Sequence, residues 1–272
     1  IIGTQGTLDL ANVAYTTTEA ITNSGTLATS TGTSNYAGVM TLGANATIDV
    51  DGTQLTISTA IGDGSTGYGI TKDGNGALTL SGTNTYTGDT VISNGTLTVS
   101  ATGTLAATTD VSVAENAIYD VDSTDTIQSL SGAGTINIAI TKTLTFGDAT
   151  NDKTISGVIE GAGSIEKTGS GTLTLSGTNT YTGDTTITNG TLTVNAAGKL
   201  GNGNYSGTLT VAASTIFNFS SSSDQSFSNW GTGSGTINLN GSGTVTLIGD
   251  QNFTGTLNVS QMLVMYNGTS GT

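Results

Sequence analysis

The chain has 272 residues, 41 of them glycine, with a formal net charge of −14 and no proline, cysteine or histidine. The missing cysteines and histidines exclude disulfides, thiol nucleophiles, the usual catalytic triads and the common zinc sites. An acidic chain whose five basic residues are all lysines is also a poor candidate for binding nucleic acid or anionic lipid surfaces.

The start of the chain, Ile1-Ile2-Gly3, has neither a basic region nor an apolar run. We therefore expect any export signal to have been removed or to lie outside this chain. No run of 18 apolar residues follows, so we expect no membrane-spanning helix. The enrichment in threonine and valine, punctuated by glycine and asparagine, predicts many short strands and no amphipathic helix.

The strongest signal is an internal repeat. Residues 72–99 and 167–194 match at 23 of 28 positions without a gap, at an offset of 95 residues. A weaker copy spans 241–266, and a trace surrounds Tyr36 and Gly38. Self-similarity of this kind is typical of solenoids and other repeat architectures.

Each copy alternates apolar and polar residues, as in Leu78-Thr79-Leu80, so the apolar side chains share one face of a strand. The pairs Asn94-Gly95 and Asn189-Gly190 tolerate positive φ and predict turns. Tyr86 and Tyr181 come just before a corner, and we expect them to cap an edge of the core.

The stretch 100–166 between the two best copies follows the same pattern. Its alternating apolar sets are Val111/Val113, Ile136/Ile138/Ile140 and Leu144/Phe146. No shift in composition marks a linker, so we expect 1–272 to form one continuous array. These residues alone leave two architectures open, an antiparallel meander with Asn-Gly hairpins and a parallel β-solenoid.

Residues 127–194 resemble the passenger-associated transport repeat of bacterial autotransporters. The resemblance rests on SLSGAGTINI (129–138), KTLTFGD (142–148), the stretch 155–194 and the copy at 72–99. It implies a right-handed parallel β-helix (β-solenoid) exported through a C-terminal outer-membrane barrel. It also implies an extracellular or cell-surface location on a Gram-negative bacterium.

Nothing in this chain resembles the barrel itself, so we expect a passenger fragment or a protein that reuses the repeat. With roughly 20 residues a coil, about 13 coils at a strand spacing of about 4.8 Å would extend about 60 Å. We find no cap sequence at either end, which suggests a cut from a longer rod or end-to-end joining of copies.

Two acidic pairs are candidate sites. Asp49/Asp51 and Asp120/Asp122 each flank an inward valine, so both carboxylates point outward, as a glycosidase pair requires. The neighbourhood lacks an aromatic platform, and we interpret both pairs as the solvent face of a strand. Residues 119–125 contain three aspartates that could bind calcium, but an acidic corner loop explains them as well.

Two glycine-rich stretches, 62–69 and 201–207, lack the helix that a phosphate-binding fingerprint requires, and we interpret both as loops. Asp89 and Asp184 recur at one repeat position and fit turn chemistry. The aromatic cluster of the chain could be a ligand patch, but a core stack is the favoured interpretation; its members are Phe217, Phe219, Phe227 and Trp230.

We therefore predict a non-enzymatic structural or adhesive extracellular β-solenoid. We predict no catalytic, cofactor-binding or metal-binding residue and no cofactor. The predicted partners are the chain itself, by end-to-end or lateral association, or surface glycans and cells. The alternatives are a subunit of a self-assembling extracellular filament and a carbohydrate-active β-helix enzyme using an aspartate pair.

Overall fold

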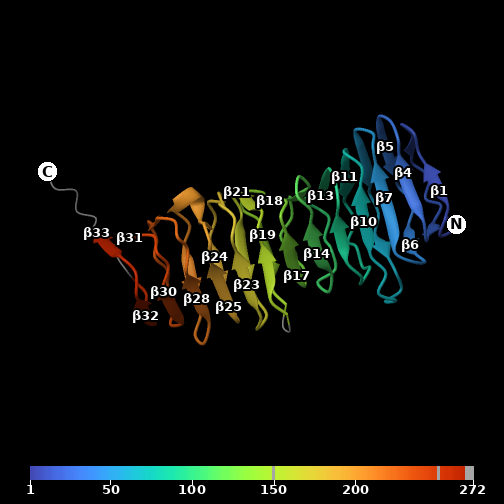
Figure 1. Cartoon of the computed structure of the whole chain (residues 1–272). Coiled ribbons are helices and arrows are strands. Elements are labelled where there is room, and N and C mark those ends of the chain that lie inside the picture. The colour runs from blue at the N-terminus through green and yellow to red at the C-terminus, as the bar shows by residue number, and fades with distance from the viewer. Residues whose placement is uncertain (149–150, 250–251, 267–272) are drawn as a thin grey trace. The chain divides into compact units, whose positions relative to one another are not determined.

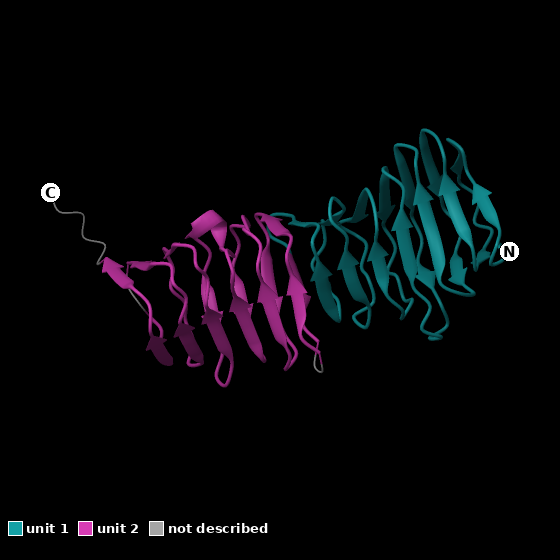
Figure 2. Ribbon diagram, viewed as in Figure 1, with its two compact units in different colours: residues 1–142 teal, residues 143–272 magenta. Residues whose placement is uncertain are grey.

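The computed structural model describes residues 1–148, 151–249 and 252–266, which form short β-strands and one 3-10 turn, η1 (Gly201–Gly203). Two compact units are present, Ile1–Lys142 and Thr143–Thr272 (Figure 2). The strands stack in parallel as a β-solenoid of about 13 turns, which confirms the predicted fold class and excludes the antiparallel meander. The described residues include no helix long and apolar enough to cross a membrane. Continuity of 1–272 as a single array stays a prediction.

In unit 1, consecutive strands of each sheet come from consecutive coils (Figure 1). Sheet I of unit 1 contains β1 (Thr7–Asp9), β4 (Thr26–Thr29), β7 (Ala46–Val50), β10 (Ile70–Asp73), β12 (Thr90–Ile92), β14 (Asp110–Val113) and β17 (Ser129–Gly132). Sheet II contains β2 (Ala14–Tyr15), β5 (Thr33–Tyr36), β8 (Gln54–Ile57), β11 (Ala77–Leu80), β13 (Thr96–Val99), β15 (Ile118–Val121) and β18 (Thr135–Ile138). Sheet III contains β3 (Ile21–Asn23), β6 (Met40–Leu42) and β9 (Ile61–Gly62), and the unit also includes β16 (Asp125–Thr126).

Unit 2 is built in the same way. Its sheet I contains β20 (Lys153–Ile155), β23 (Thr172–Leu175), β25 (Thr191–Val194), β28 (Ile216–Phe219), β30 (Thr236–Leu239) and β32 (Thr256–Val259). Its sheet II contains β19 (Thr143–Phe146), β22 (Ser164–Lys167), β24 (Thr185–Ile187) and β27 (Leu209–Val211). Its sheet III contains β26 (Asn204–Tyr205), β29 (Gln225–Phe227), β31 (Val245–Ile248) and β33 (Leu263–Tyr266), and the unit also includes β21 (Val158–Gly161).

The core of each unit consists of columns of stacked apolar side chains. The alternating pattern places one residue in two inside, and the parallel register sets it on its counterpart one coil earlier. One column in unit 1 and one in unit 2 are completely buried; they are Leu78, Leu97, Tyr119 and Ile136, and Leu173, Leu192, Phe217 and Ile237. Burying one such side chain contributes about 1.5–3 kcal/mol. Ile140, which the alternation placed inside, is 69 % exposed because β18 ends at Ile138.

The Asn-Gly turns have the predicted backbone. Gly95 and Gly190 have φ values of 64° and 69°. A Cβ atom at either position would collide with the carbonyl oxygens of the preceding coil, those of Gly76 and Gly169 being the nearest. Glycine is therefore required here both for its left-handed φ and for the close approach of two coils.

A buried asparagine stabilises one corner in both repeat copies. The Asn179 side-chain oxygen accepts the Ile159 N–H at 3.0 Å, and its amide donates to the carbonyls of Gly177 and Lys199 at 3.1 and 3.0 Å. Asn84, at the equivalent position of the earlier copy, makes the same three kinds of bond. One side chain thus bonds to backbone groups of three coils. The carbonyls of Gly177 and Lys199 also accept backbone N–H groups, whereas the Ile159 N–H depends on the Asn179 side chain.

The repeat tyrosines lie inside the core. Tyr86 and Tyr181 have no exposed surface, and each hydroxyl lies 2.6 Å from a buried threonine hydroxyl, that of Thr90 or Thr185. Our expectation that these rings cap an edge of the core was therefore wrong. The threonine at i+4 provides the partner that a buried phenol needs, so the ring can enter the interior completely.

A lysine of each repeat copy is also turned inward. The Lys72 ammonium donates to the carbonyls of Asp73, Gly74 and Asn94 at 2.8, 2.7 and 3.1 Å. Lys167 does the same with Thr168, Gly169 and Asn189 at 2.5, 2.8 and 3.2 Å. All three donors of each ammonium are used, and the third bond joins one coil to the next. Each lysine thus stabilises the glycine-containing turns of two successive coils.

Burial lowers the pKa of Lys72 and of Lys167 to about 8. The carboxylates of Asp73, Asp49 and Asp51 oppose this change at Lys72, and Asp152 opposes it at Lys167. Between pH 8 and 10.5 the unfolded chain therefore binds more protons than the folded chain at these two positions. By linkage, the contribution of each lysine to the free energy of unfolding rises with pH across this window.

We expect Asn179→Ala to lower the free energy of unfolding of unit 2 by about 1–3 kcal/mol, because the Ile159 N–H is left without a partner. Urea unfolding followed by the fluorescence of buried Trp230 measures this loss. The matched control is Asn229→Ala, because Asn229 is exposed and its side chain donates one bond, to Ser206. Equal effects of the two substitutions would contradict the role assigned to Asn179.

We expect Lys167→Met to destabilise unit 2 at pH 7, because three buried carbonyls lose their donor. The difference in unfolding free energy between the natural chain and this variant should grow as the pH rises from 8 to 10.5. The same urea titration, repeated at several pH values, measures it. Asn229→Ala, at an exposed residue without an ionisable side chain, should show no such growth. A difference that shrinks over this range would mean that Lys167 holds its proton more tightly when folded.

Candidate functional site

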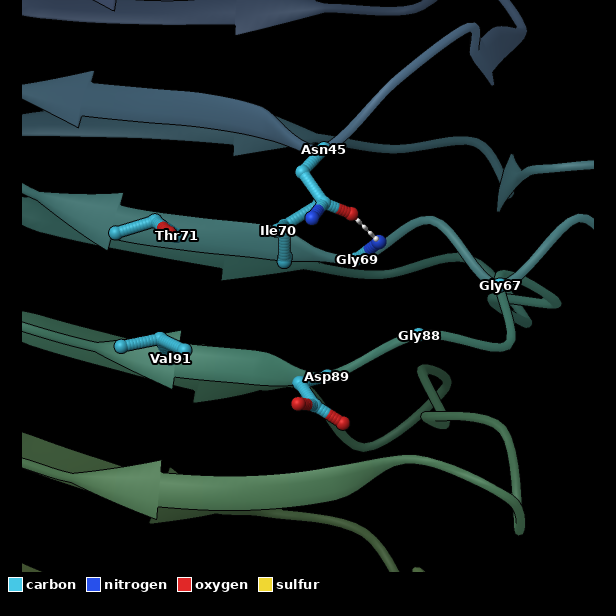
Figure 3. A pocket seen from close by; sticks show the side chains of 8 residues that line it. All are labelled: Asn45, Gly67, Gly69, Ile70, Thr71, Gly88, Asp89 and Val91. Atoms are coloured by element: carbon cyan, nitrogen blue, oxygen red, sulfur yellow. Dashed lines mark hydrogen bonds between the residues drawn. The ribbon is translucent and has the colours of Figure 1, made fainter.

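Two pockets lie beside the two glycine-rich loops that the sequence singled out. The first, in unit 1, has a volume of about 200 Å³ and lies between the ends of β10 and β12 and the loop before β10 (Figure 3). Its lining residues are Asn45, Gly67, Gly69, Ile70, Thr71, Gly88, Asp89 and Val91. The Asn45 side-chain oxygen accepts the Gly69 N–H at 2.9 Å, which fixes one wall.

A buried carboxylate organises the loop beside this pocket. Asp63 accepts the backbone N–H groups of Ser65, Gly67 and Tyr68 at 2.9, 2.8 and 3.0 Å, and the Thr87 hydroxyl at 2.7 Å. Burial alone would raise the pKa of Asp63, but these donated hydrogen bonds lower it to about 2. The stretch 62–69 is therefore a loop, as predicted, and its acidic residue is fully engaged in holding it.

The first pocket offers little for catalysis. Asp89 is the one ionisable side chain in its lining, and it is exposed. The other lining groups are backbone amides, one hydroxyl, one amide and aliphatic side chains. A general acid or base usually acts with a second ionisable group or a nucleophile within hydrogen-bond reach. This lining can hold a small polar group but does not provide such a pair.

The second pocket, in unit 2, is larger and more polar. It has a volume of about 450 Å³ and surrounds η1; it is lined by Lys199, Asn202, Gly203, Asn204, Asp224, Gln225, Ser226, Thr244 and Thr246. Asp224 accepts the Thr244 N–H at 2.7 Å. The Gln225 amide bonds to both the N–H and the carbonyl of Leu200. Amides, hydroxyls and one charge of each sign suit a polar ligand.

The aspartate pairs belong to polar columns on the outer face of the sheets. Asp49 lies beside Asp73 in the register of β7 and β10, and Asp73 accepts the Asn94 amide at 2.7 Å. Burial, then Asp51 and Asp73, raise the pKa of Asp49. Asp120 accepts the Asn137 amide at 2.7 Å, and burial followed by Asp120 raises the pKa of Asp122. The structure thus bonds Asp120 to the neighbouring coil and places Asp49 beside a third carboxylate, that of Asp73.

The three aspartates of 119–125 do not converge. Asp120 lies on the outer side of β15, whereas Asp125 is only 4 % exposed and accepts the Leu105 N–H at 2.9 Å inside a corner. Burial raises the pKa of Asp125. Within the part of the chain that the structure describes, no group of three acidic, cysteine or histidine side chains could hold a metal ion.

The aromatic cluster is part of the core of unit 2. Phe227 lies at its centre, with ring centroids 6.4, 6.2 and 4.8 Å from those of Phe217, Phe219 and Trp230. All four rings are buried. Edge-to-face packing at these distances stabilises a core, so the cluster presents no aromatic patch to a ligand.

The two inward lysines are functional candidates by their lowered pKa, and the sequence interpretation missed them. Lys72 and Lys167 use their donors on backbone carbonyls, as described above, so their role is structural. The signal was present in the alternation, because Ile70-Thr71-Lys72 and Ile165-Glu166-Lys167 place each lysine on the same side as an isoleucine.

Comparison with known proteins agrees with this architecture. A family model for the passenger-associated-transport-repeat matches residues 70–99, 165–194 and 237–261. A similar curated protein is the Adhesin BmaC autotransporter of Brucella suis biovar 1 (strain 1330), which is 46 % identical over 119 residues. That match covers 42 % of this chain and 3 % of the relative, so the chain spans a small part of the relative's length. No solved structure matches.

The family match corresponds to the coils whose interior was described above. The first two matched segments contain the inward lysine, the corner asparagine, the buried tyrosine with its threonine, and the Asn-Gly turn. The third begins at Ile237, one strand before the weaker copy seen in the sequence. These matches confirm the resemblance expected from the sequence: the chain carries passenger-associated-transport repeats and is similar to part of an autotransporter adhesin.

Proposed function

We propose that this chain is a non-enzymatic adhesive passenger, displayed outside a Gram-negative cell and contacting surfaces through the polar outer faces of its coils. The observation that carries the proposal is the set of repeats together with the adhesin relative. The adhesive role in the relative's name belongs to that protein, and we extend it to this chain as a proposal.

The outer surface supports the proposal. Along most strands the buried positions are apolar, and most of the intervening positions are threonine, serine, asparagine or aspartate. Such a surface offers many equivalent hydrogen-bonding groups at the strand spacing of about 4.8 Å. A partner that binds weakly at each position can be held firmly by many contacts at once.

The composition supports a role without catalysis. The chain has no histidine or cysteine, Asp49 lies beside Asp73 in a polar column, and Asp120 accepts the Asn137 amide. The two pockets provide hydrogen-bonding groups and few ionisable ones. These features favour a protein that binds a partner over an enzyme that cleaves a substrate.

The test is adhesion of particles coated with the purified chain. We expect coated fluorescent beads to attach to cultured epithelial cells several times more often than albumin-coated beads, because many weak contacts act together. Soluble chain added in excess should compete. Attachment equal to that of albumin-coated beads, over a panel of cell types and matrix-coated surfaces, would contradict an adhesive function.

A further inference from the structure

One outer face of unit 2 carries no ionisable side chain over five strands. We call it the threonine–asparagine face, and it consists of the outward residues of five strands of sheet I: Thr172, Thr174, Thr191, Thr193, Ile216, Asn218, Thr236, Asn238, Thr256 and Asn258. None of these ten positions is ionisable, in a chain of net charge −14. Asp152, whose carboxylate accepts the Thr172 N–H at 2.7 Å, borders the first strand.

The face is a regular two-column array. The register pairs Thr172 with Thr191, Ile216, Thr236 and Thr256 in one column. It pairs Thr174 with Thr193, Asn218, Asn238 and Asn258 in the other. Hydroxyl and amide groups therefore recur at each coil, at the strand spacing of about 4.8 Å.

Hydrogen bonds within the face fix the asparagines. The Asn218 amide donates to the Thr193 hydroxyl at 3.3 Å, Asn238 donates to Asn218 at 2.7 Å, and Asn258 donates to Asn238 at 2.8 Å. This ladder uses one of the two N–H donors of each amide. The remaining donors belong to side chains whose orientation is already fixed, which reduces the entropy that binding costs.

The face at the same repeat position in unit 1 is similar. There the outward residues of β11, β13, β15 and β18 include Thr79, Thr98, Asp120 and Asn137 in successive coils. Asp120 is the one ionisable side chain among the outward residues of these four strands, and it accepts the Asn137 amide. The array therefore accompanies the repeat, and in unit 2 it is free of carboxylates over five strands.

We propose that the threonine–asparagine face binds a neutral, extended polysaccharide, with the chain running along the coils. Such a polymer presents hydroxyls and ring C–H groups at intervals close to the strand spacing. Threonine methyls can pack on the C–H groups while hydroxyls and amides bond to the sugar hydroxyls. This inference deepens the proposed adhesive function by naming the class of ligand.

A second copy of this chain fits the face less well. Two molecules that each carry a net charge of −14 repel one another. An anionic polysaccharide meets the same repulsion, and the face offers no lysine to offset it. A neutral polymer avoids this cost, and the cost of ordering it is shared over many equivalent contacts.

The test uses the full chain, amorphous cellulose as the neutral polymer and alginate beads as the anionic one. We expect cellulose to deplete the chain from solution and alginate to leave it. In titrations with soluble cello-oligosaccharides, affinity should rise with the number of rings. The absence of depletion by cellulose, or equal depletion by alginate, would overturn the inference.

The matched variants are two pairs of in-register threonines. Thr174→Val with Thr193→Val removes two hydroxyls from the face, and Thr186→Val with Thr210→Val removes two from sheet II of the same unit. The first pair should weaken cellulose binding about fivefold or more, since two hydrogen bonds are lost, and the second should leave it unchanged. Equal weakening by both pairs would overturn the inference.

Two further experimental results distinguish this inference from the proposed adhesive function. If coated beads adhere to cells but cellulose does not bind, the adhesive function stands and the glycan inference falls. If the first pair of substitutions dissociates an oligomer in sedimentation velocity without glycan, the face is a self-association surface and the inference falls. Unchanged far-ultraviolet circular dichroism in both variants excludes loss of fold as the cause.

Discussion

The structure depends on parallel, in-register stacking of coils. Each residue lies on the residue one coil earlier, so a side chain that turns inward meets the same environment in every coil. Backbone groups at the corners cannot all bond within a strand, and a polar side chain must satisfy those that are buried. Asn84 and Asn179, and the lysines Lys72 and Lys167, perform this task at positions 95 residues apart. A change at one such position affects at least two coils.

This constraint explains why the interior of the repeat is nearly invariant between its two best copies while the outside varies. Inward leucines, the buried tyrosine and the corner asparagine recur, because each fits a space fixed by the neighbouring coil. Outward positions need only tolerate a strand and water. Asp73, Ala77 and Val91 of one copy, for example, are replaced by Thr168, Thr172 and Thr186 in the other. Outward residues can therefore be substituted to change what the surface binds without disturbing the fold.

Much of this fold could be predicted from the sequence. The alternation in Leu78-Thr79-Leu80 defines the buried face, and Asn94-Gly95 defines a turn. The direction of the strands could not be derived from these residues, because an Asn-Gly turn suits a hairpin as well as a coil corner; the family resemblance decided it. Tyr86 was predicted at an edge of the core but lies inside it, because the Thr90 hydroxyl, four residues away, gives its phenol a buried partner. The alternation of apolar and polar residues does not reveal this pair. The pockets combine residues from successive coils, so they emerge only once the register is known.

The account rests on the parallel register, and the absence of cysteine from the chain allows a direct test by cross-linking. A disulfide requires Cα atoms within about 7 Å. In the register described, Thr174 and Thr193 are neighbours, whereas Thr172 and Thr193 are displaced by two residues and lie about 8 Å apart. The account predicts that the double variant Thr174→Cys with Thr193→Cys oxidises readily and that Thr172→Cys with Thr193→Cys does not. The reverse result would contradict the parallel stacking on which every other conclusion depends.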